Sequence, residues 1–157
     1  ATPMRKGEYL MSFVLARLMW LVLEVALLVI FGRFVFGVAV TGSWPAYVAV
    51  VLVGALSFSA LGLLVVSRAR TLEAVSGLMN VAMLPMWLLS GTFFSAERFP
   101  KLLQPLIQAL PLTAVNDSLR ALTNEGAGWI AVLPSLLLVT AWGLASFLAA
   151  MKLFRWE

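Results

Sequence analysis

Four long apolar segments constrain the fold of this chain more than any other feature of its sequence. A helix needs roughly 20 apolar residues to cross the ~30 Å hydrocarbon core of a bilayer, because its backbone must satisfy its own hydrogen bonds there. The expected spans cover residues 13–40, 46–67, 74–94 and 131–153. Only 11% of the residues are charged, whereas a soluble domain has about 25%. The sequence therefore predicts an all-α integral membrane protein with four transmembrane helices.

The distribution of basic residues predicts the orientation of these spans. Basic pairs flank the ends that would share one side of the membrane: Arg5, Lys6, Arg68, Arg70, Lys152 and Arg155. Cytoplasmic loops carry an excess of Lys and Arg, so we expect both termini in the cytoplasm and the connection 95–129 outside. The basic residues form no stripe along one face, so nothing indicates nucleic acid as a partner.

Two residue types are absent, and their absence limits the chemistry available. The chain has no cysteine and no histidine, which removes thiolate ligands, the commonest metal ligand and the usual general base. It also has no Gly-x-x-x-x-Gly-Lys-Ser/Thr phosphate-binding sequence. We therefore predict no catalytic, cofactor-binding or metal-binding residues, and an intramembrane enzyme is the least favoured function.

The connection between the third and fourth spans is amphipathic and contains several prolines. Its first part places apolar residues on one helical face: Leu102, Leu103, Leu106, Ile107 and Leu110. The sequence predicts a helix that begins at Pro100, is kinked at Pro105 and ends at Pro111.

A second amphipathic helix is expected to start after Thr113. Its polar face consists of Asn116, Asp117, Arg120 and Asn124. Gly126 and Gly128 should end it before Trp129 anchors the last span. Such a pair of helices could form a partly re-entrant hairpin, a lid, two helices in the headgroup plane, or a connector with no gating role.

Four stretches of the sequence together resemble a known family. They are residues 1–10 (ATPMRKGEYL), 67–77 (SRARTLEAVSG), 83–100 (MLPMWLLSGTFFSAERFP) and 110–126 (LPLTAVNDSLRALTNEG). They are similar to the membrane subunits of type 2 ATP-binding-cassette (ABC) exporters, permeases that include drug, lipid and polysaccharide exporters. Such permeases usually have six spans, so residues 1–157 are expected to be one partial permease domain. The resemblance implies that two N-terminal spans are missing and that Ala1 is not a natural start.

The resemblance also implies partners and a location. The chain would pair with a second permease copy in the lipid of a plasma membrane, expected to be a bacterial inner membrane. A separate ATPase subunit would bind ATP and Mg²⁺, so this chain would hold no cofactor.

Two groups of candidate residues follow from the same resemblance. Contact with the ATPase is expected at the N-terminal segment, through Thr2, Pro3, Arg5, Lys6 and Glu8. The candidates in the outer segment are Phe99, Pro100, Pro111, Asn116 and Asp117.

Three residues within the spans are candidates for the translocation path or a hinge. Glu24 is the one acidic residue well inside a span, and burying its charge in a bilayer is costly. Arg17 is seven residues away, about 10 Å along the helix, so we expect Glu24 to pair with another helix instead. Asn80 could hydrogen-bond between helices and Pro85 could kink the third span, either as a hinge or in static packing.

Small residues at i, i+4 spacing indicate where helices approach closely. Ala55 with Ser59, and Ala141 with Ala145 and Ala149, are the predicted packing faces.

Two other functions stay open at the level of sequence. Glu24 could couple an ion gradient to transport in a secondary transporter or channel. Alternatively, the chain could be a membrane scaffold that moves no substrate.

Overall fold

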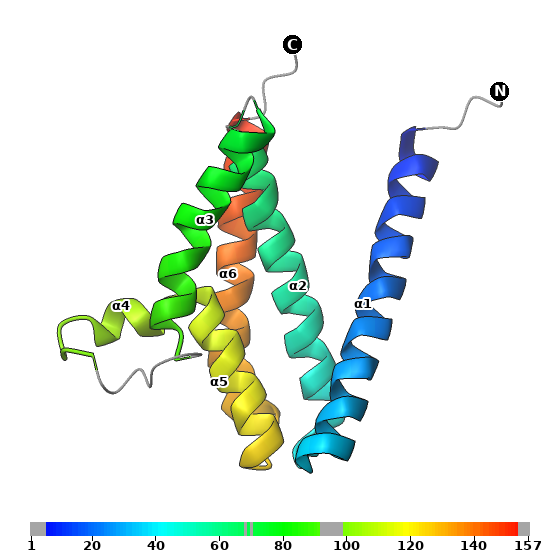
Figure 1. Cartoon of the computed structure of the whole chain (residues 1–157), viewed down its shortest axis with the longest axis vertical. Helices are drawn as coiled ribbons and strands as arrows, with labels where there is room; N and C mark the ends of the chain where they lie inside the picture. The colour runs from blue at the N-terminus through cyan, green and yellow to red at the C-terminus, as the bar shows by residue number, and fades with distance from the viewer. Residues whose placement is uncertain (1–5, 68, 70, 92–98, 154–157) are drawn as a thin grey trace. The chain divides into compact units, whose positions relative to one another are not determined.

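The structure, a computed structural model, describes residues 6–67, 69, 71–91 and 99–153, with side chains from residue 15 onward. Every regular element in these ranges is a helix, and four of them are long and apolar enough to cross a membrane. The predicted all-α membrane fold is therefore confirmed (Figure 1). The chain divides into two compact units, residues 1–39 and 40–157.

The first unit contains one helix, α1, which runs from Lys6 to Phe36. At 31 residues it is about 46 Å long, more than a bilayer core requires. Gly37 ends it with a φ of +67°, a left-handed conformation that glycine adopts without a Cβ clash, and the N–H of Val38 turns back to the carbonyl of Gly32. The prediction that this span continues to Val40 was wrong because of this turn.

The second unit contains five helices. They are α2 (Trp44–Val66), α3 (Leu72–Leu89), α4 (Gln104–Gln108), α5 (Pro111–Asn124) and α6 (Trp129–Leu153). Helix α2 has proline in its first turn, where a missing N–H costs nothing. Helix α3 begins at the side chain of Thr71, which accepts a hydrogen bond from the N–H of Ala74. It ends at Leu89, five residues before the end of the predicted span.

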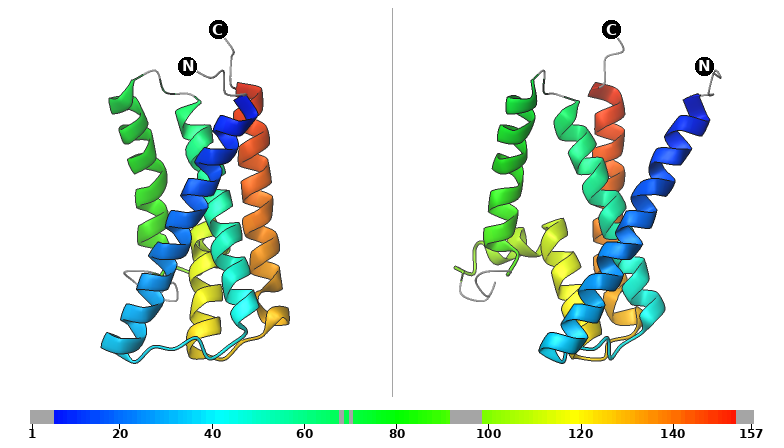
Figure 2. Two further views of the ribbon diagram at one scale, coloured as in Figure 1. Left: turned by 90° about the vertical axis from the view of Figure 1, so that its right-hand side faces the viewer. Right: turned by 45° about the vertical axis from the view of Figure 1, so that its right-hand side comes forward.

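Helices α2 and α6 run in the same direction and share the largest helix interface of this unit (Figure 2). Both begin at one end of the unit, which we call the tryptophan end after Trp44 and Trp129, their first residues. Near the middle of α2, the Ser57 hydroxyl donates a hydrogen bond of 2.8 Å to the carbonyl of Val139.

Helices α2 and α6 approach each other closely at Gly143. A Cβ added there would lie 2.5 Å from the Ser57 oxygen and 3.1 Å from the Ser57 Cα. The buried residues of α6 are Val132, Val139, Ser146 and Ala150, on the same side as Gly143. Of the predicted packing face, Ala141 and Ala145 are exposed and Ala149 is half-buried in this unit. Their packing against another helix stays a prediction.

A small apolar core joins three helices near the tryptophan end. Ala46 and Val50 of α2, Leu122 of α5 and Val132 of α6 are at most 2% exposed. Leu122 belongs to α5, which is not one of the four spanning helices. Helix α5 is therefore part of the core of this unit.

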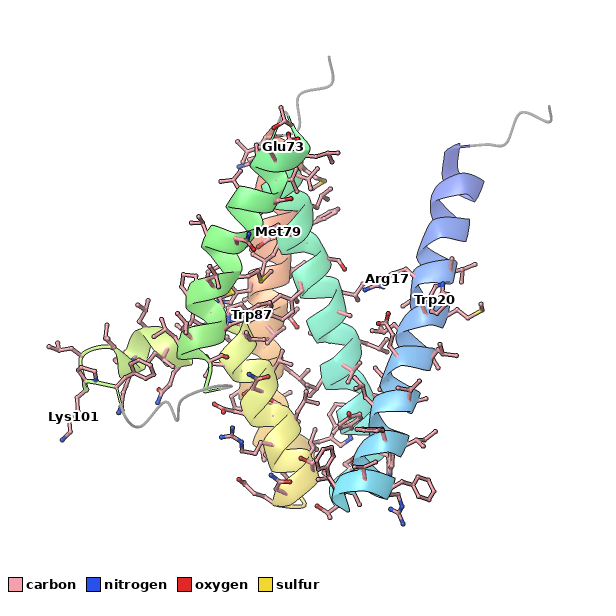
Figure 3. The ribbon with its side chains drawn as sticks, viewed as in Figure 1. Arg17, Trp20, Glu73, Met79, Trp87 and Lys101 are labelled. Carbon is pink, nitrogen blue, oxygen red and sulfur yellow. The ribbon has the colours of Figure 1, made fainter. Side chains whose placement is uncertain are left out.

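Helix α3 packs more loosely than α2 and α6. It has no buried residue, and Val81 and Trp87 are 72% and 50% exposed. Met79 faces α2, where its methyl group would lie 3.3 Å from a Cβ added at Gly62 (Figure 3). Most of the α3 surface is thus free within this unit.

Gly143→Ala is expected to destabilise the second unit by about 1–3 kcal/mol, because the new methyl group collides with the Ser57 hydroxyl, which is held in its hydrogen bond to Val139, and presses against the Ser57 Cα. Gly77→Ala on α3 is the matched control, since nothing lies within 4 Å of its added Cβ. There alanine should be neutral or stabilising by up to about 1 kcal/mol. Thermal unfolding of both variants in detergent measures the difference. Equal melting temperatures would contradict the described contact.

Candidate functional site

Helix α5 lies beside the first halves of α2 and α6. Val115, early in α5, contacts Gly54, eleven residues into α2, while the carbonyl of Leu122 accepts a 2.8 Å hydrogen bond from the N–H of Gly42, just before α2. The helix therefore runs along α2 from near its middle to the tryptophan end, as Figure 1 also shows. Because α2 is long enough to span a bilayer, α5 lies within the layer that α2 crosses.

The end of α4 meets the middle of α6. The indole N–H of Trp142, the fourteenth residue of α6, donates a 2.8 Å hydrogen bond to the carbonyl of Ala109. Pairing this carbonyl matters because an unsatisfied backbone group in hydrocarbon costs several kcal/mol. Helices α4 and α5 therefore fold back beside α6 and α2, which is the packing expected of the re-entrant arrangement.

The proline positions differ from the prediction. Helix α4 begins at Gln104 with Pro105 in its first turn, so Pro105 starts a helix and kinks none. Pro111 is the first residue of α5, which therefore begins before Thr113. In both cases proline occupies the first turn, where its fixed φ favours the helix and its missing N–H is not needed. Pro100 lies before these helices and is exposed.

Hydrogen bonds hold α5 at both of its ends. The Asn116 amide donates to the Ser90 hydroxyl at the end of α3, at 3.3 Å. At the other end, the Thr41 hydroxyl donates to the carbonyl of Thr123 at 2.8 Å. Gly42 approaches so closely that an added Cβ would collide with the carbonyl oxygen of Ala127.

The buried face of α5 is partly polar. It consists of Pro111, Thr113, Ala114, Ser118 and Leu122. The Ser118 hydroxyl donates to the carbonyl of Ala114, whereas the Thr113 hydroxyl is buried without a partner among the described residues. The apolar residues Val115, Leu119 and Leu122 of α5 are all buried or half-buried.

A cavity of about 370 Å³ lies between the polar face of α5 and the first turns of α6. We call it the α5–α6 cavity. Its lining residues are Asp117, Ser118, Arg120, Ala121, Glu125, Ala131, Val132 and Ser135. Two carboxylates and one guanidinium therefore face a space large enough for a small organic molecule.

Partial burial changes the acidity of Asp117 in this cavity. Loss of solvent raises the pKa of its carboxyl group, the nearby Arg120 guanidinium lowers the pKa, and Glu125 raises it, with a net upward shift. Helix α5 lies outside the four spanning helices, and its charged face borders this cavity. The ionised form of Asp117 is therefore less favourable in the folded protein than in water.

The three candidates within the spans, Glu24, Asn80 and Pro85, do not line the α5–α6 cavity. The expectation that Glu24 pairs with another helix and not with Arg17 was wrong within the described residues: Arg17 and Glu24 lie two turns apart on one face of α1, and their side chains approach to 3.7 Å (Figure 3 labels Arg17). Asn80 and Pro85 are exposed on α3, which continues through the proline.

The remaining candidates lie at the edges of the described ranges. Thr2, Pro3 and Arg5 lie outside the described residues, and Lys6 and Glu8 belong to α1 by their backbone alone. Phe99 is half-buried, and Pro111 and Asn116 belong to the α5 packing described above. Their part in contacting an ATPase or a substrate stays a prediction.

Comparison with known proteins identifies the family. The ABC-2 type transporter family matches residues 1–123, so the chain belongs to this family. It is also 29% identical over 128 residues to the inner membrane transport permease YhhJ of Escherichia coli strain K12. The YhhJ of Shigella flexneri is similar to the same extent. The predicted resemblance is confirmed.

The match with these relatives covers 82% of this chain and 34% of their own length. The chain therefore corresponds to about a third of each of these permeases. No solved structure matches it significantly.

Trp142→Phe is expected to loosen the α4–α5 segment, because phenylalanine keeps the ring but cannot donate to Ala109. Because the Ala109 carbonyl is left without this donor, the loss should cost about 1–3 kcal/mol, which corresponds to roughly 5- to 150-fold faster hydrogen exchange of the amides of residues 106–110. Trp87→Phe, at a half-exposed tryptophan of α3, is the control. Equal exchange in the two variants would exclude an anchoring role for Trp142.

Asp117→Asn is expected to raise the melting temperature slightly at neutral pH. The folded wild type holds the Asp117 proton more tightly than the unfolded chain does, so it loses stability as pH rises through the two pKa values. The advantage of the variant should therefore vanish as pH falls below the usual carboxyl range. Melting curves across pH test this sign, and a variant advantage confined to acidic pH would contradict it.

Proposed function

We propose that this chain forms part of the membrane permease of an ABC exporter. The observation that carries the proposal is the family match over residues 1–123, most of the chain. The similarity to inner membrane transport permeases supports the same role and a bacterial inner membrane as its location. On this proposal both ends of the chain face the cytoplasm, and the tryptophan end lies at the outer surface.

ATP-driven transport then requires a partner. These 157 residues contain no phosphate-binding loop. The family match supports a separate ATPase subunit that binds ATP and Mg²⁺ and drives the change in access. The N-terminal segment that includes Lys6 and Glu8 transmits the motion. A drug, lipid or polysaccharide-like substrate crosses at the interface with a second permease copy.

The loose packing of α3 supports this division of roles. Its long, exposed apolar surface includes Val81, Leu84 and Trp87, and it contains the candidate hinge Pro85. A helix with this much free surface is suited to face another subunit or a substrate path. The Asn116 amide of α5 is hydrogen-bonded to Ser90 at the end of α3. A movement of α3 would therefore displace α5 as well.

The complete tagged protein, purified from its native membrane in mild detergent, is expected to retain a stoichiometric partner with a phosphate-binding ATPase motif. Mass spectrometry of the purified complex identifies the partner. Transport in reconstituted vesicles should require ATP and persist when the proton gradient is collapsed. Transport that needs the proton gradient and is lost in Glu24→Gln would instead establish the ion-coupled function. Stable partner binding without transport would identify a scaffold.

A further inference from the structure

The α5–α6 cavity has a charge pattern that nothing in the permease role explains. Its three charged residues all come from α5, in the order Asp117, Arg120, Glu125. Helix α6 contributes Ala131, Val132 and Ser135 to the lining. Two carboxylates and one guanidinium give the cavity a formal charge of −1.

The carboxylates of the cavity are not engaged in close ion pairs. Among the described residues, the ion pair within 4.0 Å is that of Arg17 with Glu24, in the other unit. Arg120 influences Asp117 through space without a direct contact of that kind. Asp117 and Glu125 therefore keep oxygen atoms available for a ligand.

The position of the cavity strengthens electrostatic binding. Ser135 lies six residues beyond Trp129, about 9 Å along α6 from the tryptophan end. Tryptophan is typical of the boundary between headgroups and hydrocarbon, so the cavity reaches from this boundary into the membrane layer. A charge pair is worth more here than in water.

We propose that the α5–α6 cavity binds an organic ammonium ion, which donates charge-assisted hydrogen bonds to the carboxylates of Asp117 and Glu125 and to the neutral hydroxyl oxygen of Ser135. A cation is favoured over an anion because carboxylates outnumber guanidinium groups and one negative charge is left without a counter-charge. The volume of about 370 Å³ suits an amine with one aromatic ring. Ala121, Ala131 and Val132 contact the apolar part of the ligand.

The proposed site is formed by residues of α5 and α6. Its ability to bind an ammonium ion does not depend on the proposed ATP-driven export. Binding is therefore measured without transport, on the complete protein in phosphatidylcholine nanodiscs. Three probes of similar size differ in charge: phenethylammonium, neutral phenethyl alcohol and the anion hydrocinnamate. Equilibrium dialysis against protein-free nanodiscs corrects for partition into lipid. Phenethylammonium should bind saturably and at least about tenfold more tightly than the other two.

Charge variants identify the binding groups. Asp117→Asn and Glu125→Gln should each weaken phenethylammonium binding by about tenfold or more. Arg120→Met should tighten it, because it removes a like charge from the cavity. Glu73→Gln, an exposed carboxylate at the start of α3, is the control and should leave binding unchanged. Melting temperatures confirm that each variant is folded.

Three results would overturn the proposal. The first is equal binding of phenethylammonium and phenethyl alcohol, which would show that charge does not contribute. The second is preference for hydrocinnamate, or loss of binding in a folded Arg120→Met variant, which would indicate recognition of an anion. The third is the absence of saturable binding above the protein-free control.

Discussion

The close approach of α2 and α6 is the contact on which the rest of the second unit depends. Lipid is as apolar as a leucine side chain, so helices in a membrane associate by van der Waals packing and hydrogen bonds, with small residues at the contact. Gly143 and Ser57 provide both at one point. With α2 and α6 held parallel, their first halves form the surface on which α5 packs.

The re-entrant position of α5 follows from how its backbone and polar groups are satisfied. Its buried face includes Ser118, which bonds within the helix, and its two ends are tied through Asn116 and Leu122. The carbonyl of Ala109, at the deep end of this segment, is paired by Trp142. A polar helix can therefore enter the membrane layer with its charged face directed to the α5–α6 cavity.

Much of the candidate site could be predicted from local sequence. The alternation of apolar and polar residues predicted α5, its polar residues Asp117 and Arg120, and its end at Gly126. The long-range hydrogen bonds could not be predicted, because Thr41 is far in sequence from its acceptor Thr123 in α5, and Trp142 is far from its acceptor Ala109 at the end of α4. Trp142 did carry a signal: an indole N–H in an apolar span needs an acceptor. The pairing of Arg17 with Glu24 was missed because backbone rise alone ignores the reach of two long side chains.

By itself the sequence determined the number of spans and the family, because these follow from hydrophobic length and from local sequence motifs. Tertiary structure decided which small residues form the α2–α6 contact, since alanine, serine and glycine lie on several faces of each helix. It also decided that α5 packs along the first halves of α2 and α6. An amphipathic helix can pack against lipid headgroups or against protein, and only the surface offered by α2 and α6 distinguishes the two.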